Sequence, residues 1–255
     1  MRLGDTMKSA CALALLGFGV LVVCTIGGAL AQGEAGPVKH IKWRALVVAG
    51  DDSEAVFDNA VDALGEMLKA KGVKPVDRFT SDPQVANDNR RIATAIVLAR
   101  ALGATKAGSG TGCLIFITSH GSREGMLMRN DLANRRVLQP QLFDRMLDAG
   151  CGSAPTVAII SGCFSGVFLK PDIKAPNRII ITAARADRPS FGCGHEEQYT
   201  YFDSCMLQSW PDVQTWRALF DATAACVHDK ENALGFKHSE PQASFGKAVA
   251  SLALP

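Results

Sequence analysis

The sequence predicts an α/β fold in which a mostly parallel sheet is covered by helices on both faces. Short apolar runs rich in β-branched residues, such as those at 45–49, 113–118 and 157–160, are too short for helices. Longer segments between them carry apolar residues at helical spacing. A strand with no polar face is typical of a parallel sheet buried between two layers of helices.

The elements follow one another in a βα alternation. Strands are expected at 45–49, 73–79, 113–118, 157–160 and 178–183, with a short β-arm at 126–128. Helices are expected at 56–68, 92–102, 138–147, 199–209 and 213–227. Ser53 is the predicted N-cap of the first helix, and Lys71-Gly72 ends it. No repeat or linker divides the chain after its first residues.

The N-terminal segment 1–31 has the pattern of a secretory signal peptide. Arg2 and Lys8 precede an apolar run at 10–26, and Ala29-Leu30-Ala31 is a cleavage site of the A-x-A type. Cleavage leaves 32–255 as one domain, which we expect to be periplasmic or secreted. Because the apolar run is long for a signal peptide, the alternative is an inner-membrane anchor, with membrane association through this segment.

Composition excludes one class of partner. The chain has 255 residues, 47% hydrophobic and 20% charged, and its net charge is +2. This balance is ordinary for a globular protein and shows no basic excess, so no nucleic-acid partner is expected. No C-x2-C or H-x3-H spacing is present, so no metal site is predicted.

Two predicted strands each end in a reactive side chain. Ser119-His120-Gly121 follows the strand at 113–118, and Ser161-Gly162-Cys163 follows the strand at 157–160. In open α/β sheets, ligands and reacting groups gather at the carboxyl ends of the strands. A free cysteine is mostly protonated at neutral pH, and a nearby imidazole can take its proton. If the two strands are neighbours, His120 and Cys163 can form a catalytic dyad.

The flanking glycines fit the same chemistry. Gly121 and Gly162 permit a tight backbone, and backbone N–H groups at Gly121 and Cys163 are candidates for an oxyanion hole. The alternative is that Cys163 is an inert buried thiol and His120 is unrelated to it.

The segments around the dyad resemble a known family. The matching segments are VVAGDD at 47–52, FITSHGS at 116–122, IISGCFSG at 159–166, ITAARADRPSFGCG at 181–194 and TYF at 200–202. Together they are similar to the legumain-like cysteine peptidases, peptidase family C13, in the caspase-like clan. The resemblance implies a caspase-like three-layer sandwich with a central sheet of about six strands.

The resemblance also implies an activity. Cys163 would be the nucleophile of a cysteine endopeptidase, His120 its general base and acid, and the acyl-enzyme a thioester. The substrate would be a peptide or protein, and no cofactor is implied. The same family includes a transamidase catalytic subunit, so transfer to an amine is an alternative. A non-catalytic binding domain with the same fold is another.

The chain departs from legumain around the substrate site. Ser161 stands where legumain has a glutamate, and either Asp203 or Ser204 stands where it has a second acidic residue. Cleavage strictly after asparagine is therefore not expected. Asp52 stands at the place of legumain's catalytic asparagine, and an aspartate can also orient an imidazole.

The loop after the strand at 178–183 is expected to line the substrate groove. It contributes Arg185 and Ser190, which we predict to bind substrate together with Ser161. The alternative is that Arg185 and its neighbours only cap the loop.

Six cysteines follow the N-terminal segment. Cys163 must stay reduced to act as a nucleophile, and Cys113 lies within a buried strand. One or two disulfides are expected among the other four, with the pairing open. These four are Cys151, Cys193, Cys205 and Cys226.

Overall fold

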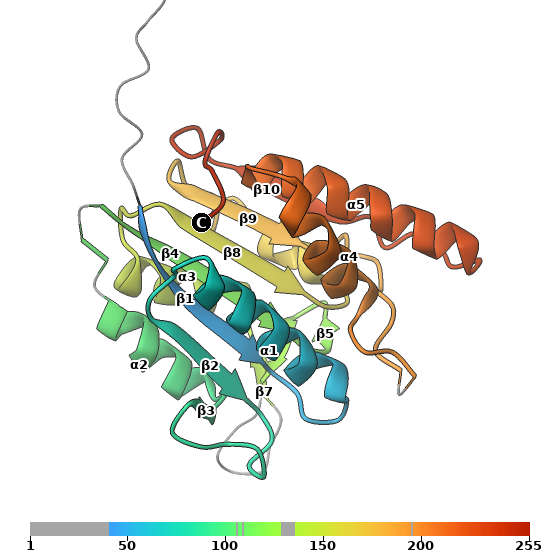
Figure 1. Ribbon diagram of the computed structural model, residues 1–255, viewed down its shortest axis with the longest axis horizontal. Helices are drawn as coiled ribbons and strands as arrows, with labels where there is room; N and C mark the ends of the chain where they lie inside the picture. Colours follow the sequence, from blue (N-terminus) through green and yellow to red (C-terminus); the bar gives the residue numbers. More distant parts are fainter. Residues whose placement is uncertain (1–40, 106, 109, 129–135, 195) are drawn as a thin grey trace, which may run out of the picture. The chain divides into compact units, whose positions relative to one another are not determined.

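A seven-stranded sheet forms the centre of the domain, as the computed structural model in Figure 1 shows. Its strands are β1 (Lys42–Ala49), β2 (Val76–Thr80), β3 (Arg90–Ile92), β4 (Thr111–Thr118), β8 (Thr156–Ser161), β9 (Arg178–Thr182) and β10 (Gln242–Phe245). They lie in the order β10-β9-β8-β4-β1-β2-β3. All neighbours are parallel except β9 and β10, which are antiparallel. The predicted, mostly parallel sheet is confirmed.

The structure describes residues 41–255 apart from 106, 109, 129–135 and 195. The predicted signal peptide or anchor at 1–31 lies outside these residues and stays a prediction.

Helices cover both faces of the sheet (Figure 1). On one face lie α1 (Ala55–Ala70), α4 (Tyr201–Ser209) and α5 (Trp216–Ala233), which share one hydrophobic cluster with the sheet. On the other lie α2 (Ala95–Thr105) and α3 (Pro140–Gly150), which share a second cluster. The fold is therefore the expected three-layer sandwich.

The fold also contains a small second sheet and two 3-10 helices. A three-stranded sheet is formed by β5 (Gly121–Ser122), β6 (Gly125–Met128) and β7 (Arg136–Leu138), and β6 is the predicted β-arm. The two short 3-10 helices are η1 (Ser165–Phe168) and η2 (Trp210–Asp212).

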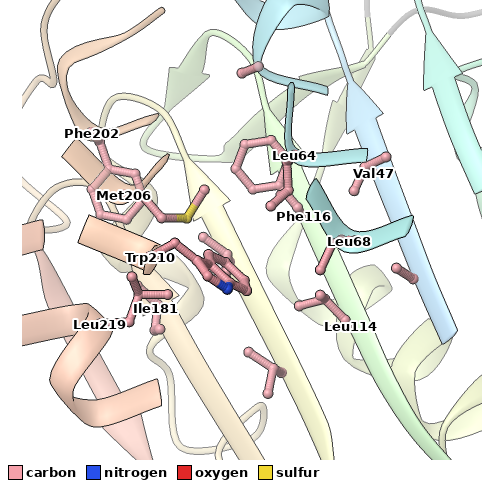
Figure 2. Packing of buried hydrophobic residues seen from close by; sticks show 14 of the residues in the cluster. Val47, Leu64, Leu68, Leu114, Phe116, Ile181, Phe202, Met206, Trp210 and Leu219 are labelled. Atoms are coloured by element: carbon pink, nitrogen blue, oxygen red, sulfur yellow. The ribbon is translucent and has the colours of Figure 1, made fainter. Parts of the chain in front are cut away.

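Alternate residues of the strands enter opposite core layers. Val47, Leu114 and Phe116 lie in the cluster with α1, α4 and α5, whereas Ile115 and Ile117 lie in the cluster with α2 and α3. Figure 2 shows the first cluster, in which strand side chains lie among those of the covering helices. Because both of their faces are buried, the central strands β1, β4, β8 and β9 each contain an apolar run in the sequence.

The structure corrects three details of the prediction. Glu54, not Ser53, is the N-cap of α1, and the Ser53 N–H instead donates to Asp51 Oδ1 over 2.9 Å. Of the strands in the central sheet, the short strands β3 and β10 were not predicted. Both are only three or four residues long and lie at the sheet edges, where little of the strand is buried and the apolar signal is weak.

One disulfide connects the sheet to a helix, and a second connects two helices of the same layer. Cys113 of β4 pairs with Cys151 at the end of α3, and Cys205 of α4 pairs with Cys226 of α5. The expectation that Cys113 stands apart from the disulfides is wrong, because its side chain faces α3 rather than the α1 layer. Of the cysteines that the structure describes, Cys163 and Cys193 are free.

Candidate active site

The strands β4 and β8 are parallel neighbours, and their register fixes the site. Thr118 at the end of β4 lies opposite Ser161 at the end of β8. The Ser119 N–H donates to the Ser161 carbonyl over 3.1 Å, which extends the ladder one residue beyond β4. His120 and Cys163 each come two residues after this matched pair. The sheet therefore places the two predicted catalytic residues at the same edge, each two residues beyond a paired position.

Close backbone packing joins the two strand ends. A β-carbon at Gly121 would overlap the carbonyl oxygen of Cys163, and one at Gly162 would overlap the carbonyl oxygen of Ser119. A side chain at either position would push the strand ends apart. The two glycines thus permit the approach of the segments that carry His120 and Cys163.

The Cys163 thiol contacts Ser190 in the loop after β9. Its Sγ lies 3.3 Å from the Ser190 amide nitrogen and 3.7 Å from the Ser190 hydroxyl, and both groups can donate to a thiolate. The thiol itself can donate to the Ser190 carbonyl over 3.4 Å. Ser190 was predicted to bind substrate, and the structure places it directly against the sulfur.

The turn after Cys163 is anchored on the same loop. Phe164 has a left-handed backbone with φ of 57°, and its N–H donates to the Arg188 carbonyl over 2.8 Å. This conformation is uncommon for a residue with a side chain and recurs at functional sites. It turns the chain from β8 into η1 and leaves Cys163 partly exposed.

The imidazole of His120 packs against α1. Its ring meets the buried ring of Phe57 edge-on, with centroids 5.2 Å apart and an interplanar angle of 81°. Such edge-to-face contact is a preferred arrangement of aromatic rings. Phe57 therefore restricts the orientation of the His120 ring while the ring stays partly accessible.

The acidic pair after β1 lies at the same sheet edge, because β1 is the other neighbour of β4. Asp51 is buried, and its Oδ1 accepts the Ser53 N–H. Asp52 is exposed. The position of Asp52 is compatible with a role beside His120, and that role stays a prediction.

A buried polar cluster lies behind the dyad, which we call the Asp203 cluster: Thr118, Ser161, Thr200 and Asp203. Thr118 Oγ1 donates to Asp203 Oδ2 over 2.7 Å, and the hydroxyls of Ser161 and Thr200 are 3.5 Å apart. Thr200 caps α4 by accepting the Asp203 N–H over 3.2 Å.

The two residues that could stand for legumain's second acidic residue lie in different surroundings. Asp203 lies in the cluster, whereas Ser204 accepts a hydrogen bond from Gln208 on an exposed part of α4. Burial raises the pKa of the Asp203 carboxyl to about 6, against the opposing effect of the Ser161, Thr118 and Thr200 hydroxyls. No described residue donates a hydrogen bond to Asp203 Oδ1. Asp203 is thus a buried acid whose Oδ1 can accept a further hydrogen bond.

The arginines of the groove loop are held in ion pairs. Arg185 binds Asp187 through Nε and Glu240 through Nη1, each over 2.5 Å, and Arg188 Nη2 lies 3.0 Å from Glu240 Oε1. The Arg185 guanidinium lowers the pKa of Asp187 to about 2. A substrate carboxylate would therefore have to compete with Asp187 and Glu240 for these guanidinium groups.

The family of the chain follows from comparison with known proteins. The model of the peptidase C13 family matches residues 98–251. The chain belongs to this family. The matched stretch contains His120, Cys163, Ser190 and Asp203, whereas Asp51 and Asp52 precede it.

Solved structures agree on the fold of this C13 peptidase. The crystal structure of caspase-1 from Spodoptera frugiperda is similar, with a TM-score of 0.57 and 13% sequence identity. The match covers 81% of this chain and 87% of the caspase chain. At this identity the likeness shows a caspase-like fold. No curated protein matches the sequence. Family and fold together identify a cysteine-type peptidase, a hydrolase.

The described residues offer no group of three or more histidine, cysteine or acidic side chains suited to a metal ion.

We predict that Asp203 makes the stability of this C13 peptidase depend on pH. Its pKa is about 6 in the folded chain and near 3.8 when unfolded, so between these values only the folded state keeps the proton. Stability from this group is full below pH ~4 and is lost as the pH rises through ~6, a total of about 3 kcal/mol.

Urea unfolding of wild type and Asp203→Asn at several pH values between 4 and 7 measures this effect. The amide is neutral and can still accept the Thr118 hydroxyl, so the variant should lose less stability than wild type over this range. Parallel stability profiles for the two proteins would show that Asp203 does not titrate there.

Proposed function

We propose that the chain is an exported cysteine endopeptidase that cleaves peptide bonds with Cys163 and His120. The observation that carries the proposal is the register of β4 and β8, which sets Thr118 opposite Ser161 and so presents both side chains together. The free state of Cys163 and its partial exposure support it, because a nucleophile must be reduced and accessible.

The proposed reaction begins with transfer of the Cys163 proton to His120. The thiolate then attacks the carbonyl carbon of the scissile bond, a C–S bond forms, and the carbonyl oxygen takes the negative charge. Backbone N–H groups of Gly121 and Cys163 are the proposed donors to this oxyanion. When the C–N bond breaks, His120 gives its proton to the leaving amine, and the acyl group stays on sulfur as a thioester.

Water completes the cycle. His120 takes a proton from the water molecule that attacks the thioester carbon, and the C–S bond breaks to release the carboxylic acid and the thiol. Contact with Phe57 supports this role, since it restricts the ring that must face first the sulfur and then the water. Asp52 is proposed to orient the same ring.

The Asp203 cluster is the proposed pocket for the side chain of the scissile residue. Ser161 belongs to it and lies two residues before Cys163, which supports a pocket beside the sulfur. The acceptor at Asp203 Oδ1 and the hydroxyls of Ser161 and Thr200 suit a polar side chain that can donate hydrogen bonds. Ser161 carries no charge, so we propose that the pocket is not strictly asparaginyl.

Export is proposed from the N-terminal segment, and the two disulfides support it. Disulfides such as Cys113–Cys151 and Cys205–Cys226 form and persist mainly in oxidising compartments, such as the periplasm or the exterior. Among the described residues, no helix has the length and apolar character needed to cross a membrane.

We expect Cys163→Ala and His120→Ala each to abolish peptide hydrolysis, by about a thousandfold or more, because each removes a group that takes part in bond making. Asp52→Asn should keep more activity than Asp52→Ala, since the amide can still accept a hydrogen bond. Hydrolysis of a peptide library and circular dichroism of each variant provide the measurements.

Cys193→Ala is the matched control, because Cys193 is the other free cysteine of the described chain and burial raises its pKa. Iodoacetamide should label Cys163 before Cys193, and the control should keep its activity. Full activity in purified Cys163→Ala would end the proposal.

A second prediction concerns the scissile residue. A buried hydrogen bond lost from a specificity pocket typically costs ~1–3 kcal/mol, or roughly ten- to a hundredfold in rate. Because Ser161 replaces a charged residue of legumain, peptides that differ only at the scissile residue should not favour asparagine by a large factor. If the asparagine peptide leads all others by a hundredfold in kcat/KM, the pocket is legumain-like after all.

The export proposal predicts a mature N-terminus at Gln32. Cleavage after Ala31 would produce it, and mass spectrometry of the protein from the cell envelope detects it. Recovery of intact residues 1–31 on membrane-bound protein would identify an anchor instead.

A further inference from the structure

Two stacked aromatic rings lie next to the loop that holds the nucleophile. Phe191 directly follows Ser190, whose N–H donates to Cys163 Sγ. The Phe236 ring stacks on the Phe191 ring, with centroids 4.5 Å apart and an interplanar angle of 23°. Phe236 is 41% exposed, so the stack is open to solvent. An apolar surface is therefore present within a few residues of the reacting sulfur.

The backbone holds Phe236 outside the core. After α5 ends at Ala233, Gly235 turns the chain with φ of 70°, and the Phe236 N–H donates to the Glu231 carbonyl over 2.9 Å. Phe236 belongs to neither hydrophobic cluster. Single exposed apolar residues need no explanation, but this ring is fixed in place against a second ring. A pre-ordered apolar surface can bind a ligand at low entropic cost.

Tyr201 links the stack to the Asp203 cluster along the chain. The Tyr201 ring lies 6.1 Å from the Phe236 ring between centroids, and its N–H donates to the Phe191 carbonyl over 3.0 Å. Tyr201 directly follows Thr200, which belongs to the Asp203 cluster. We call Phe191, Tyr201 and Phe236 the aromatic patch.

We infer that the aromatic patch is a substrate subsite for a large apolar side chain on the N-terminal side of the scissile bond. This inference rests on the proposed peptidase function. The acyl part of the substrate ends in the residue whose side chain is proposed to enter the Asp203 cluster. The preceding residues would then run past Ser190 and Phe191, towards the patch that adjoins the cluster.

The place of the patch along an extended substrate sets the position of the ligand, and its aromatic rings set the chemistry. Extended chain advances about 3.3 Å per residue, so a side chain two to four residues before the scissile bond can reach rings one residue beyond Ser190. Aromatic rings favour aromatic or large aliphatic partners. A phenylalanine or leucine at one of these positions is the expected ligand.

Kinetics with matched fluorogenic peptides test the inference. Each peptide carries its reporter directly after the scissile residue, and phenylalanine or alanine is placed two, three or four residues before the bond. Wild type should favour phenylalanine by about tenfold in kcat/KM at one position. Phe236→Ala should reduce this preference to about twofold, mainly through KM, and Phe236→Leu should keep part of it.

Ile96→Ala is the matched control, because Ile96 is 58% exposed on α2, against the other face of the sheet. Its preference should equal that of wild type. Equal rates for phenylalanine and alanine peptides at all three positions would overturn the subsite. A dimer that dissociates in Phe236→Ala, measured by light scattering, would also overturn it and make the patch an interface between copies.

A binding assay separates failure of the subsite from failure of the proposed function. Cys163→Ala lacks the nucleophile, so fluorescence anisotropy can measure its affinity for the same labelled peptides without turnover. Tighter binding of the phenylalanine peptide would support the subsite even if wild type hydrolyses none of the set. Equal binding of both peptides would overturn it.

Discussion

The pairing of β4 with β8 is the constraint on which the rest of the structure depends. Parallel pairing places Thr118 opposite Ser161, so both strands end at the same level of the sheet edge. A slip of one residue would turn every side chain of β8 to the opposite core layer and would separate Cys163 from His120. The apolar side chains of β8, all buried, make such a slip costly. The same hydrophobic packing that stabilises the sheet therefore sets the relative positions of the strand ends that carry the proposed dyad.

Ionisable and polar groups concentrate where the apolar strands end. Thr118 and Ser161 are the last residues of their strands and face the α1 and α4 layer, where Asp203 at the start of α4 meets them. Burial of a carboxylate is unfavourable, and the raised pKa of Asp203 expresses this cost. Groups that a fold retains at such a cost are candidates for function. In this chain the buried carboxyl belongs to the cluster that contains Ser161, two residues before the proposed nucleophile.

The loop after β9 connects the site to the C-terminal part of the domain. Ser190 contacts the sulfur, Arg188 anchors the turn after Cys163, and Arg185 and Arg188 bind Glu240 beside β10. Glu240 has a left-handed backbone with φ of 55°. The proposed substrate groove is thus shaped by segments about fifty residues apart in the sequence, and ion pairs hold them together.

The sequence by itself determined the fold class and pointed to the two residues of the proposed dyad. Buried parallel strands are unbroken apolar runs, and His120 and Cys163 stand out because each follows such a run in a glycine-rich turn. Local patterns suffice for these central strands, because full burial requires a run of apolar residues that the sequence itself displays. The N-cap of α1 and the edge strands β3 and β10 escaped prediction, because backbone geometry or pairing with a distant strand defines them rather than an apolar pattern.

Only the tertiary structure decided the contacts between distant segments. It showed that Asp203 rather than Ser204 meets Thr118, that Cys113 pairs with Cys151, and that Phe236 stacks on Phe191. The ion pairs of Arg185 and Arg188 are also contacts of this kind, and they change the charge that a substrate would meet. Such contacts depend on which face of a helix or strand meets which neighbour. That choice is made by packing of the whole chain, and no local spacing encodes it.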